Sequence, residues 1–195
     1  MYKQSVTLPL NKVTRKKTNK IRFYLILCCF SMLFFSTPSF SVDREEMKAV
    51  YLGVVSKHVI WLTNTAIQQQ ESSFFNICIF GDDSFGGYLK LYDNKKIKNK
   101  PVKILHPKEI ENLADCQLVF IGQSKRGSLA KIFNFIDGKA ILTVSLIRGF
   151  AEKKGMIQFY ENGSRLDVKI NYQVTLNHGF EIKSSLLKYS KVINR

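Results

Sequence analysis

Two adjacent acids, Asp82 and Asp83, stand where a strand should end, and they could hold a divalent cation but would repel a phosphate. They follow the apolar run Phe74–Phe80 and Gly81. A divalent cation would need a further acid and a lysine at later strand ends, as in phosphate-accepting receiver domains, and those ends offer no acid. The glycine spacing approaches a Walker A loop, but Gly87 stands where that motif needs lysine. The residues favour helix capping by one of the two acids over metal or phosphate chemistry.

A nucleophilic serine is the second chemistry to consider, because GQSKRG at Gly122–Gly127 resembles the G-x-S-x-G elbow of hydrolases. Arg126 occupies the place of the second glycine, and its side chain would crowd the sharp turn that the motif requires. Ser124 is more simply the residue that caps a following helix. A hydrolase that uses Ser124 is therefore only the third hypothesis for the function of this protein.

The histidines and cysteines form no metal or redox motif. His58, His106 and His178 are scattered, with no pair at metal-ligand spacing, and neither Cys78 nor Cys116 belongs to a C-x-x-C. We therefore predict no catalytic residue, no metal and no other cofactor, and we expect a protein that is not an enzyme.

Residues 1–41 have the organisation of a secretory signal peptide. Residues 1–22 contain seven Lys/Arg and no acid, and the apolar run Phe23–Phe35 follows. Ser39 and Ser41 are small residues that predict a cut after Ser41. The apolar run is shorter than the about 20 residues that span a bilayer, although an uncleaved membrane anchor is the alternative. The remaining residues, 42–195, are enough for one domain.

Export also changes the charge of the protein. Seven of the 30 basic residues leave with the signal peptide and all 15 acids remain, so the exported chain carries a net charge of +8. The densest basic stretch is KKIKNK at Lys95–Lys100, which reads either as a solvated loop or as a binding site. We expect no nucleic acid partner, because lipid phosphates at the membrane surface are the anions that an exported domain meets.

The exported chain keeps two cysteines, Cys78 and Cys116. An even pair in an exported protein indicates a disulfide, and two free buried thiols are the alternative. A bridge would close a loop of 38 residues and contribute about 4 kcal/mol in the chain-entropy model.

Apolar periodicity predicts alternating helices and strands over the first part of the exported chain. Asp43–Leu62 is expected to form an amphipathic helix. Its apolar face consists of residues at three- and four-residue intervals: Met47, Val50, Tyr51, Val54, Val55, Val59 and Leu62. Thr63–Ser73 is expected to be a polar connection. The alternation predicts a parallel sheet with helices packed over it. The expected strands are Phe74–Phe80, Pro101–Leu105, Gln117–Ile121 and Ala140–Val144, and the expected helices between them are Ser84–Tyr92, Pro107–Leu113 and Ser124–Phe135.

The pattern changes after residue 150. Gly155–Tyr160 and Arg165–Ile170 alternate in polarity on either side of Asn162-Gly163, the strongest short signal for a hairpin turn. Asn171–Asn177 is expected to form a short helix, and Ser184–Ile193 a closing amphipathic helix. The fold class is therefore α/β: one domain with a mixed, mostly parallel sheet flanked by helices and with a C-terminal antiparallel hairpin.

Several of these segments, taken in order, resemble the YfiR-like family of small exported bacterial proteins. The most specific of them is GMIQFYENGSRLDVKIN at Gly155–Asn171. Departures are small: Leu62 stands where the family often has proline, and Lys154 replaces a common glycine. The other segments are the helix that ends in Trp61, CIFGDDSFG (Cys78–Gly86), C-x-L-V-F-I-G (Cys116–Gly122), ILTVS followed by Gly149-Phe150, and SSLLK (Ser184–Lys188).

The resemblance implies a periplasmic regulator without catalytic activity, which binds an inner-membrane diguanylate cyclase and holds it inactive. Release of that inhibition would raise cyclic-di-GMP and promote biofilm formation. The resemblance also implies a homodimer and an intramolecular disulfide between Cys78 and Cys116. Some members have a second cysteine pair that this chain lacks, so the one bridge is left either to stabilise the fold or to sense oxidation.

We expect partner contacts from Trp61, Phe85 and Tyr88, which the predicted elements place where the first helix ends and the first strand-to-helix turn begins, although core packing is the alternative for each. The alternative function is a periplasmic sensor module that takes a small anion or nucleotide at the strand ends and acts on a membrane histidine kinase or other receptor.

Overall fold

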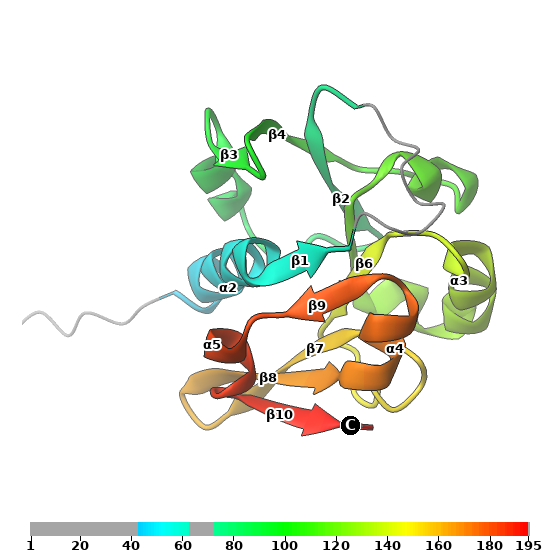
Figure 1. Ribbon diagram of the computed structural model, residues 1–195. Helices are drawn as coiled ribbons and strands as arrows, with labels where there is room; N and C mark the ends of the chain where they lie inside the picture. The colour runs from blue at the N-terminus through cyan, green and yellow to red at the C-terminus, as the bar shows by residue number, and fades with distance from the viewer. Residues whose placement is uncertain (1–42, 63–71, 195) are drawn as a thin grey trace, which may run out of the picture. The chain divides into compact units, whose positions relative to one another are not determined.

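Parallel strands form the middle of the sheet (Figure 1). The computed structural model describes residues 43–62 and 72–194, which belong to a unit spanning Val42–Arg195. Most of these strands are short apolar runs rich in β-branched residues, as expected where helices cover both faces. In spatial order the parallel strands are β4 (Lys100–Leu105), β2 (Phe75–Phe80), β5 (Leu118–Ile121), β6 (Leu142–Ser145) and β7 (Ile157–Asn162).

Additional strands complete the two edges of the sheet. On one edge, β3 (Lys96–Ile97) pairs antiparallel with β4. On the other edge, β8 (Arg165–Asn171) pairs antiparallel with β7, and β10 (Ser190–Ile193) pairs parallel with β8. The resulting mixed, mostly parallel sheet confirms the predicted α/β class and the predicted hairpin.

The hairpin turn differs in detail from the expected one. Asn162 pairs with Arg165, so the two turn residues are Gly163 and Ser164. Gly163 has a φ of +62°, whereas Asn162 is still part of β7 and does not take a positive φ. A positive φ at the first turn residue alone is the pattern of a type II′ turn, in which glycine is the favoured residue.

The first helix ends earlier than its sequence suggests. α2 spans Arg44–His58, and the chain then continues as β1 (Val59–Trp61), which pairs antiparallel with β9 (Phe180–Ile182). Asp43 caps the start of α2 by accepting a hydrogen bond from the Glu45 N–H at 3.1 Å. The prediction of a helix to Leu62 was therefore wrong at its end, because two β-branched residues and a tryptophan find a strand partner far along the chain.

α2 turns only part of the predicted apolar face towards the core. Val55 is buried as predicted, and Met47 and Tyr51 are partly buried against the core. The side chains that it buries are Ala49, Leu52, Val55 and Ser56. Val50 and Val54, which were expected to face inward, are 48 % and 37 % exposed. The predicted connection at residues 63–73 lies largely outside the described residues.

Most of the remaining predicted helices are shorter and tighter than expected. In place of Ser84–Tyr92 there is a 3-10 helix, η1 (Tyr88–Tyr92), and in place of Pro107–Leu113 there is η2 (Glu111–Asp115). The segment from Ser124 begins as η3 (Gln123–Ser128) and becomes α-helical only in α3 (Leu129–Ile136). Gly86 and Gly87 both have positive φ, which delays the start of η1. The short helix after β8 is confirmed as α4 (Tyr172–Asn177), with Asn171 as its cap.

The closing helix predicted over Ser184–Ile193 was wrong. Only Ser184–Leu187 is helical (α5), and Ser190–Ile193 forms β10 beside β8. The edge of the sheet supplies β10 with backbone partners that local periodicity cannot reveal, and tertiary context overrides a weak helical pattern.

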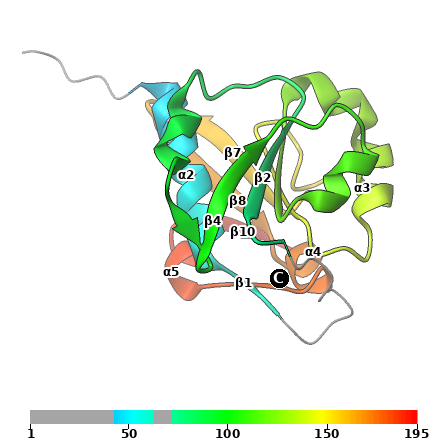
Figure 2. The same cartoon turned by 90° about the horizontal axis from the view of Figure 1, so that it is seen from above.

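The sheet has an apolar core on each face, and Figure 2 shows α2 and α3 on opposite sides of β2 and β4. On the α2 side, Leu52 and Val55 pack with Ile77 and Ile79 of β2. On the α3 side, the alternate residues of β2 belong to a cluster that includes Leu129 and Ile132. Every residue of β2 is buried as a result, which is the pattern of a strand covered on both faces.

The α3-side core contains the predicted disulfide. Cys78 of β2 is bonded to Cys116, which lies just before β5, with their Cα atoms 5.9 Å apart. The exposed fractions of the two cysteines are 0 % and 1 %. A reductant cannot reach either sulfur unless the structure opens, so the bridge is placed to stabilise the fold.

A buried polar network explains much of the family-like run Gly155–Asn171. Gln158 Oε1 accepts the N–H of Ala151 at 3.3 Å, and Asn171 Nδ2 donates to the Ala151 carbonyl at 2.8 Å. The Asn171 carbonyl in turn accepts the Thr175 hydroxyl at 2.6 Å. Because each buried polar group needs a partner, these bonds fix the segment between β6 and β7 against the sheet. This run therefore supplies structure more than reactive groups.

Gly155 provides a test of how tightly this segment is packed. A Cβ at residue 155 would lie 2.7 Å from Phe150 Cγ and closer still to other ring atoms, and Phe150 is fully buried. We expect Gly155→Ala to lower the free energy of unfolding by about 1–3 kcal/mol through overpacking. Gly127→Ala is the matched control, because a Cβ there meets nothing within 4 Å. Equal stability of the two variants in urea denaturation would contradict the packing argument.

The disulfide generates a second prediction. Replacing Cys78 and Cys116 together by alanine should lower the free energy of unfolding by about 4 kcal/mol, because the bridge closes a loop of 38 residues. In the wild-type protein, maleimide labelling after dithiothreitol treatment should require a denaturant. Rapid labelling of both cysteines under native conditions would instead identify the bridge as an accessible redox sensor.

Candidate strand-end site and binding surfaces

The strand order creates a switch point between β2 and β5. From β2 the chain passes to β4 on one side, and from β5 it passes to β6 on the other. In open α/β sheets, a crevice outside the carboxyl ends of two such strands is where ligands usually bind. Asp82 and Ser124 follow these ends, so the two chemical candidates from the sequence do meet at one place.

Asp82 and Ser124 bond to each other across this point. The Ser124 N–H donates to Asp82 Oδ1 at 2.7 Å, and the Asp82 N–H donates to Ser124 Oγ at 3.0 Å. Gly122 permits the close approach, because a Cβ there would lie 2.6 Å from the Asp82 carbonyl oxygen. The polar groups at the switch point are thus used to join two loops.

Neither acid nor serine caps a helix as predicted. Asp83 Oδ1 accepts the N–H of Phe85 at 2.8 Å, which is a local turn, while η1 begins after Gly87 without a side-chain cap. Ser124 lies inside η3, whose cap position is Gly122. The capping predictions were wrong in position. The acids and the serine accept hydrogen bonds from backbone N–H groups in the loops between strand and helix instead.

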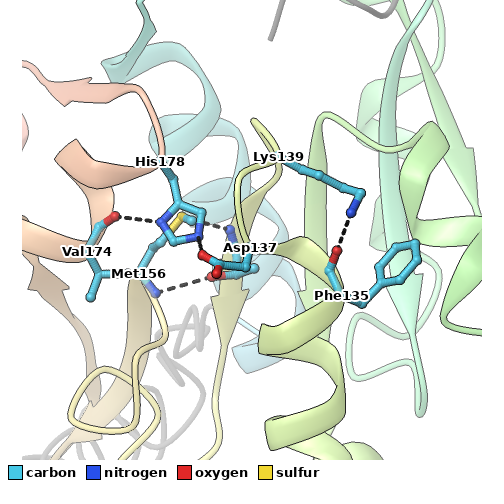
Figure 3. A network of polar contacts seen from close by, with 7 residues as sticks. Phe135, Asp137, Lys139, Met156, Val174 and His178 are labelled. Carbon is cyan, nitrogen blue, oxygen red and sulfur yellow. Dashed lines mark hydrogen bonds and ion pairs between the residues drawn. The ribbon is translucent and has the colours of Figure 1, made fainter. Parts of the chain in front are cut away.

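The histidines make separate, local contacts. His106 Nε2 lies 3.6 Å from Asp83 Oδ2. Figure 3 shows His178 between α4 and the turn after α3, with Nδ1 2.9 Å from the Val174 carbonyl and Nε2 4.0 Å from Asp137 Oδ1. Within residues 43–62 and 72–194, no three His, Cys, Asp or Glu side chains gather in a way that could hold a metal ion.

Trp61 joins the small β1–β9 sheet to the main one. Its ring meets Phe75 of β2 and Phe180 of β9 edge to face, with centroids 5.5 Å and 5.3 Å away. Its Nε1 is enclosed and has no hydrogen-bond partner among the described residues.

The three aromatic residues expected to contact a partner are not brought together. Tyr88 donates its hydroxyl to Asp43 Oδ2 at 3.1 Å, at the start of α2, whereas Trp61 follows the end of α2. A helix of 15 residues is about 22 Å long, so these two side chains lie far apart. Phe85 has no exposed surface and packs on Phe120 with centroids 4.6 Å apart.

The sequence analysis missed one surface feature and did not bring together the parts of a second. The first is the outer face of α2, where the exposed Val50 and Val54 stand one turn apart, together with Leu91, an exposed apolar residue of η1. Tyr92 holds η1 against α2 by donating its hydroxyl to the Ala49 carbonyl at 2.6 Å, and burial raises the pKa of this tyrosine. The small residues Ala49, Gly53 and Ser56 were the available signal that α2 turns a partly different face inward.

The second feature is a group of lysines around Trp61. The stretch Lys95–Lys100, expected to be a solvated loop or a binding site, contains the turn of a hairpin in which Ile97, next to the turn, is buried. Lys98 at the turn reaches over the Trp61 ring, with Nζ 5.3 Å from the ring centroid. In the part of the chain that the structure describes, no helix is long and apolar enough to span a bilayer.

The Asp82–Ser124 contact predicts a pH dependence. Burial alone would raise the pKa of Asp82, but hydrogen bonds from the Ser124 N–H and hydroxyl outweigh it and lower the pKa. The contribution of Asp82 to stability is therefore fully present above the ordinary aspartate pKa of about 3.9, and it is lost as the pH falls through the lower folded value. Urea denaturation of wild type and Asp82→Asn should show a stability difference at neutral pH that shrinks in this acidic range. Asp93→Asn is the control, and a pH-independent difference for Asp82→Asn would contradict the assignment.

Comparison of the sequence with known protein families identifies the family to which this chain belongs. A search among curated proteins gave no match to this chain. A model of the YfiR/HmsC-like family matches residues 45–191, which include the main sheet, both cysteines of the bridge and Trp61. The chain therefore belongs to the YfiR/HmsC-like family.

Proposed function

We propose that this protein is a periplasmic regulator that binds an inner-membrane diguanylate cyclase and keeps it inactive, thereby lowering cyclic-di-GMP and restraining biofilm formation. The observation that carries the proposal is the match of the YfiR/HmsC-like family over residues 45–191. The mutual bonding of Asp82 and Ser124 also supports it, because the groups most suited to chemistry are already paired. The basic, apolar N-terminal segment 1–41 supports export with cleavage after Ser41.

The regulation would work by differential affinity. A regulator that binds the inactive conformation of the cyclase better than the active one shifts the population towards the inactive state. Moving that population from 1:99 to 99:1 takes about a 10⁴-fold difference in affinity. A well-packed apolar contact can supply such a difference, and no reaction at the regulator is needed.

The outer face of α2 and η1, defined by Val50, Val54 and Leu91, is the surface proposed for the cyclase. All three side chains are large, apolar and exposed, although each lies on an ordered helix. Tyr88 extends this face towards the start of α2, whereas Trp61 lies at the other end of the helix. Phe85 could take part only if its loop opened, because its side chain is fully buried.

Homodimer formation is proposed from the same family resemblance. It affects the design of the test, because a variant that loses the dimer could lose inhibition indirectly. Sedimentation velocity of each purified variant should therefore give the same mass as wild type before its effect on signalling is interpreted.

The ligand-sensor alternative, acting on a histidine kinase or other receptor, has less support at its expected place. At the carboxyl ends of β2 and β5, Asp82 and Ser124 already bond to each other, so these groups are not free to hold a ligand. A shallow hollow between the start of α2 and the β7–β8 turn is lined by Met47 and Leu166 and is bridged by the Arg44–Glu161 ion pair of 3.1 Å. Stabilisation by several degrees in a thermal-shift screen would favour the sensor.

Deletion and complementation test the proposed function. Deleting the gene should raise cellular cyclic-di-GMP, and a wild-type copy should restore the low level. A Val54→Asp copy should not restore it, because a charge in a desolvated contact of hot-spot quality weakens binding by about 30-fold. Its unfolding midpoint should match wild type, since Val54 faces solvent.

Lys131→Asp serves as the matched control, because Lys131 is an exposed residue of α3, on the other side of the sheet. Unchanged cyclic-di-GMP after deletion would refute the cyclase proposal. Full complementation by Val54→Asp would refute only the α2–η1 face as the contact surface.

A further inference from the structure

The amino edge of the sheet around Trp61 presents a projecting basic turn. Lys98 and Asn99 form the two-residue turn between β3 and β4, with φ of +52° and +64°. Asparagine tolerates this left-handed conformation well, whereas lysine rarely adopts it. The turn places Lys98 Nζ over the face of Trp61, in the geometry of a cation–π contact.

Lysines from three separate segments converge on this edge. Lys98 comes from the β3–β4 turn, Lys103 from β4, and Lys183 from the residue after β9. Lys103 Nζ lies 5.7 Å from the centroid of the Phe74 ring, next to the start of β2. Burial first, and then the charge of Lys183, lower the pKa of Lys98, so at least two of the ammonium groups repel each other.

These positive charges have no acid bonded to them in the described part of the chain. None of the three lysines lies within 4.0 Å of a described carboxylate oxygen. The acid nearest in sequence to Lys183 is Glu181, an exposed residue of β9 between the buried Phe180 and Ile182, and the acid nearest to Lys98 is Asp93. The local balance is therefore positive, and an external anion would relieve the repulsion.

Exposed apolar side chains lie among the lysines. Phe74 is 43 % exposed, and Leu62, the residue after Trp61, is exposed as well. Aromatic rings flanked by lysines are the composition of protein surfaces that rest at a membrane–water interface. Figure 2 shows β1 running along the lower side of the view, beneath β2 and β4, so this edge is at the periphery of the fold.

We propose that this amino-edge patch, defined by Trp61, Phe74, Lys98, Lys103 and Lys183, binds the anionic headgroups of membrane phospholipids. The lysines are all exposed and come from different segments, which suits a plane of many phosphates better than one enclosed phosphate. The exposed Phe74, together with Leu62, would enter the headgroup layer between them, whereas Trp61 is packed on Phe75 and Phe180 and carries Lys98 over its ring. An acidic protein segment would need the lysines but would gain little from exposed Phe74. The inference requires export but does not depend on which membrane protein is the partner.

The expected strength follows from the number of lysines. Each lysine near an anionic surface strengthens binding about 5-fold at low ionic strength. Replacing Lys98, Lys103 and Lys183 together by glutamine should therefore weaken binding by about 100-fold. Phe74→Ser should weaken it further without changing its dependence on salt, because Phe74 contributes apolar contact and no charge.

Vesicle sedimentation tests the proposal with the exported, purified protein. Vesicles of phosphatidylglycerol and phosphatidylcholine in a 1:3 ratio should bind wild type at about 50 mM salt and release it as the salt is raised. Pure phosphatidylcholine vesicles should bind much less, which also separates this contact from insertion of an uncleaved N-terminal segment. The triple glutamine variant should show the loss given above, with an unchanged unfolding midpoint.

The matched control replaces Lys108, Arg126 and Lys131 by glutamine. These exposed cations lie after the carboxyl end of β4, in η3 and on α3, away from the patch, and the change in net charge is the same. Equal losses for the two triple variants would overturn the proposal, since they would show only a response to net charge. Absence of binding to the anionic vesicles would overturn it too.

Two further results would assign the patch to another occupant and so overturn the proposal. Inorganic phosphate at millimolar concentration, at constant ionic strength, would displace the protein from vesicles if the patch were a site for a single phosphate. If the triple variant bound vesicles normally but no longer co-purified with a membrane protein, the occupant would be an acidic protein segment. The cyclic-di-GMP experiment is independent of all these outcomes, so failure of one proposal is distinguishable from failure of the other.

Discussion

The burial of β2 on both of its faces is the constraint on which the rest of the structure depends. Its six residues are all buried, with alternate side chains in the two cores. Burying a large apolar side chain contributes roughly 1.5–3 kcal/mol, so this strand is stable only if helices cover both faces. α2 covers one face, α3 covers the other, and the Cys78–Cys116 bridge fastens β2 to the start of β5 on the α3 side.

The same constraint explains why the strand ends carry so little free chemistry. With β4 and β5 parallel to β2, the loops after β2 and β5 leave at the same edge and crowd each other. Gly122 leaves room for this close approach, and the mutual bonds of Asp82 and Ser124 tie the two loops together. Binding functions are then left to the outer surfaces of the covering layers and to the opposite edge of the sheet.

Local pattern predicted the central strands and the β7–β8 hairpin, because each is a short apolar or alternating run between turn residues. It could not predict β1 and β10. Val59–Trp61 continues a helical pattern, and it becomes a strand only because Phe180–Ile182, far along the chain, supplies its backbone partners. β10 likewise depends on the free edge of β8. The prediction of which side of α2 faces the core was partly wrong, because the small residues Ala49 and Ser56 are core residues.

The candidate surfaces were predictable only in part. Trp61, the lysine stretch and the Asp82, Asp83 and Ser124 side chains could each be singled out by type. Their neighbours could not, because the contacts of Trp61 with Phe75, Phe180 and Lys98 join four segments through long-range pairing. Val50 and Val54 carried no signal of their own, since a valine on a helix is ordinarily a core residue.

The two proposed surfaces would contribute differently to regulation. Only a contact that distinguishes two conformations of a partner can shift its population, and that role falls to the α2–η1 face. A contact with lipid is the same for either conformation, so it cannot bias the partner. It can nevertheless hold the regulator at the membrane and raise its effective concentration beside the partner. The two surfaces share one short stretch of chain, because Trp61 ends β1, which directly follows α2. The amino-edge patch would then set the concentration of regulator at the membrane. The α2–η1 face would determine which conformation of the partner is stabilised.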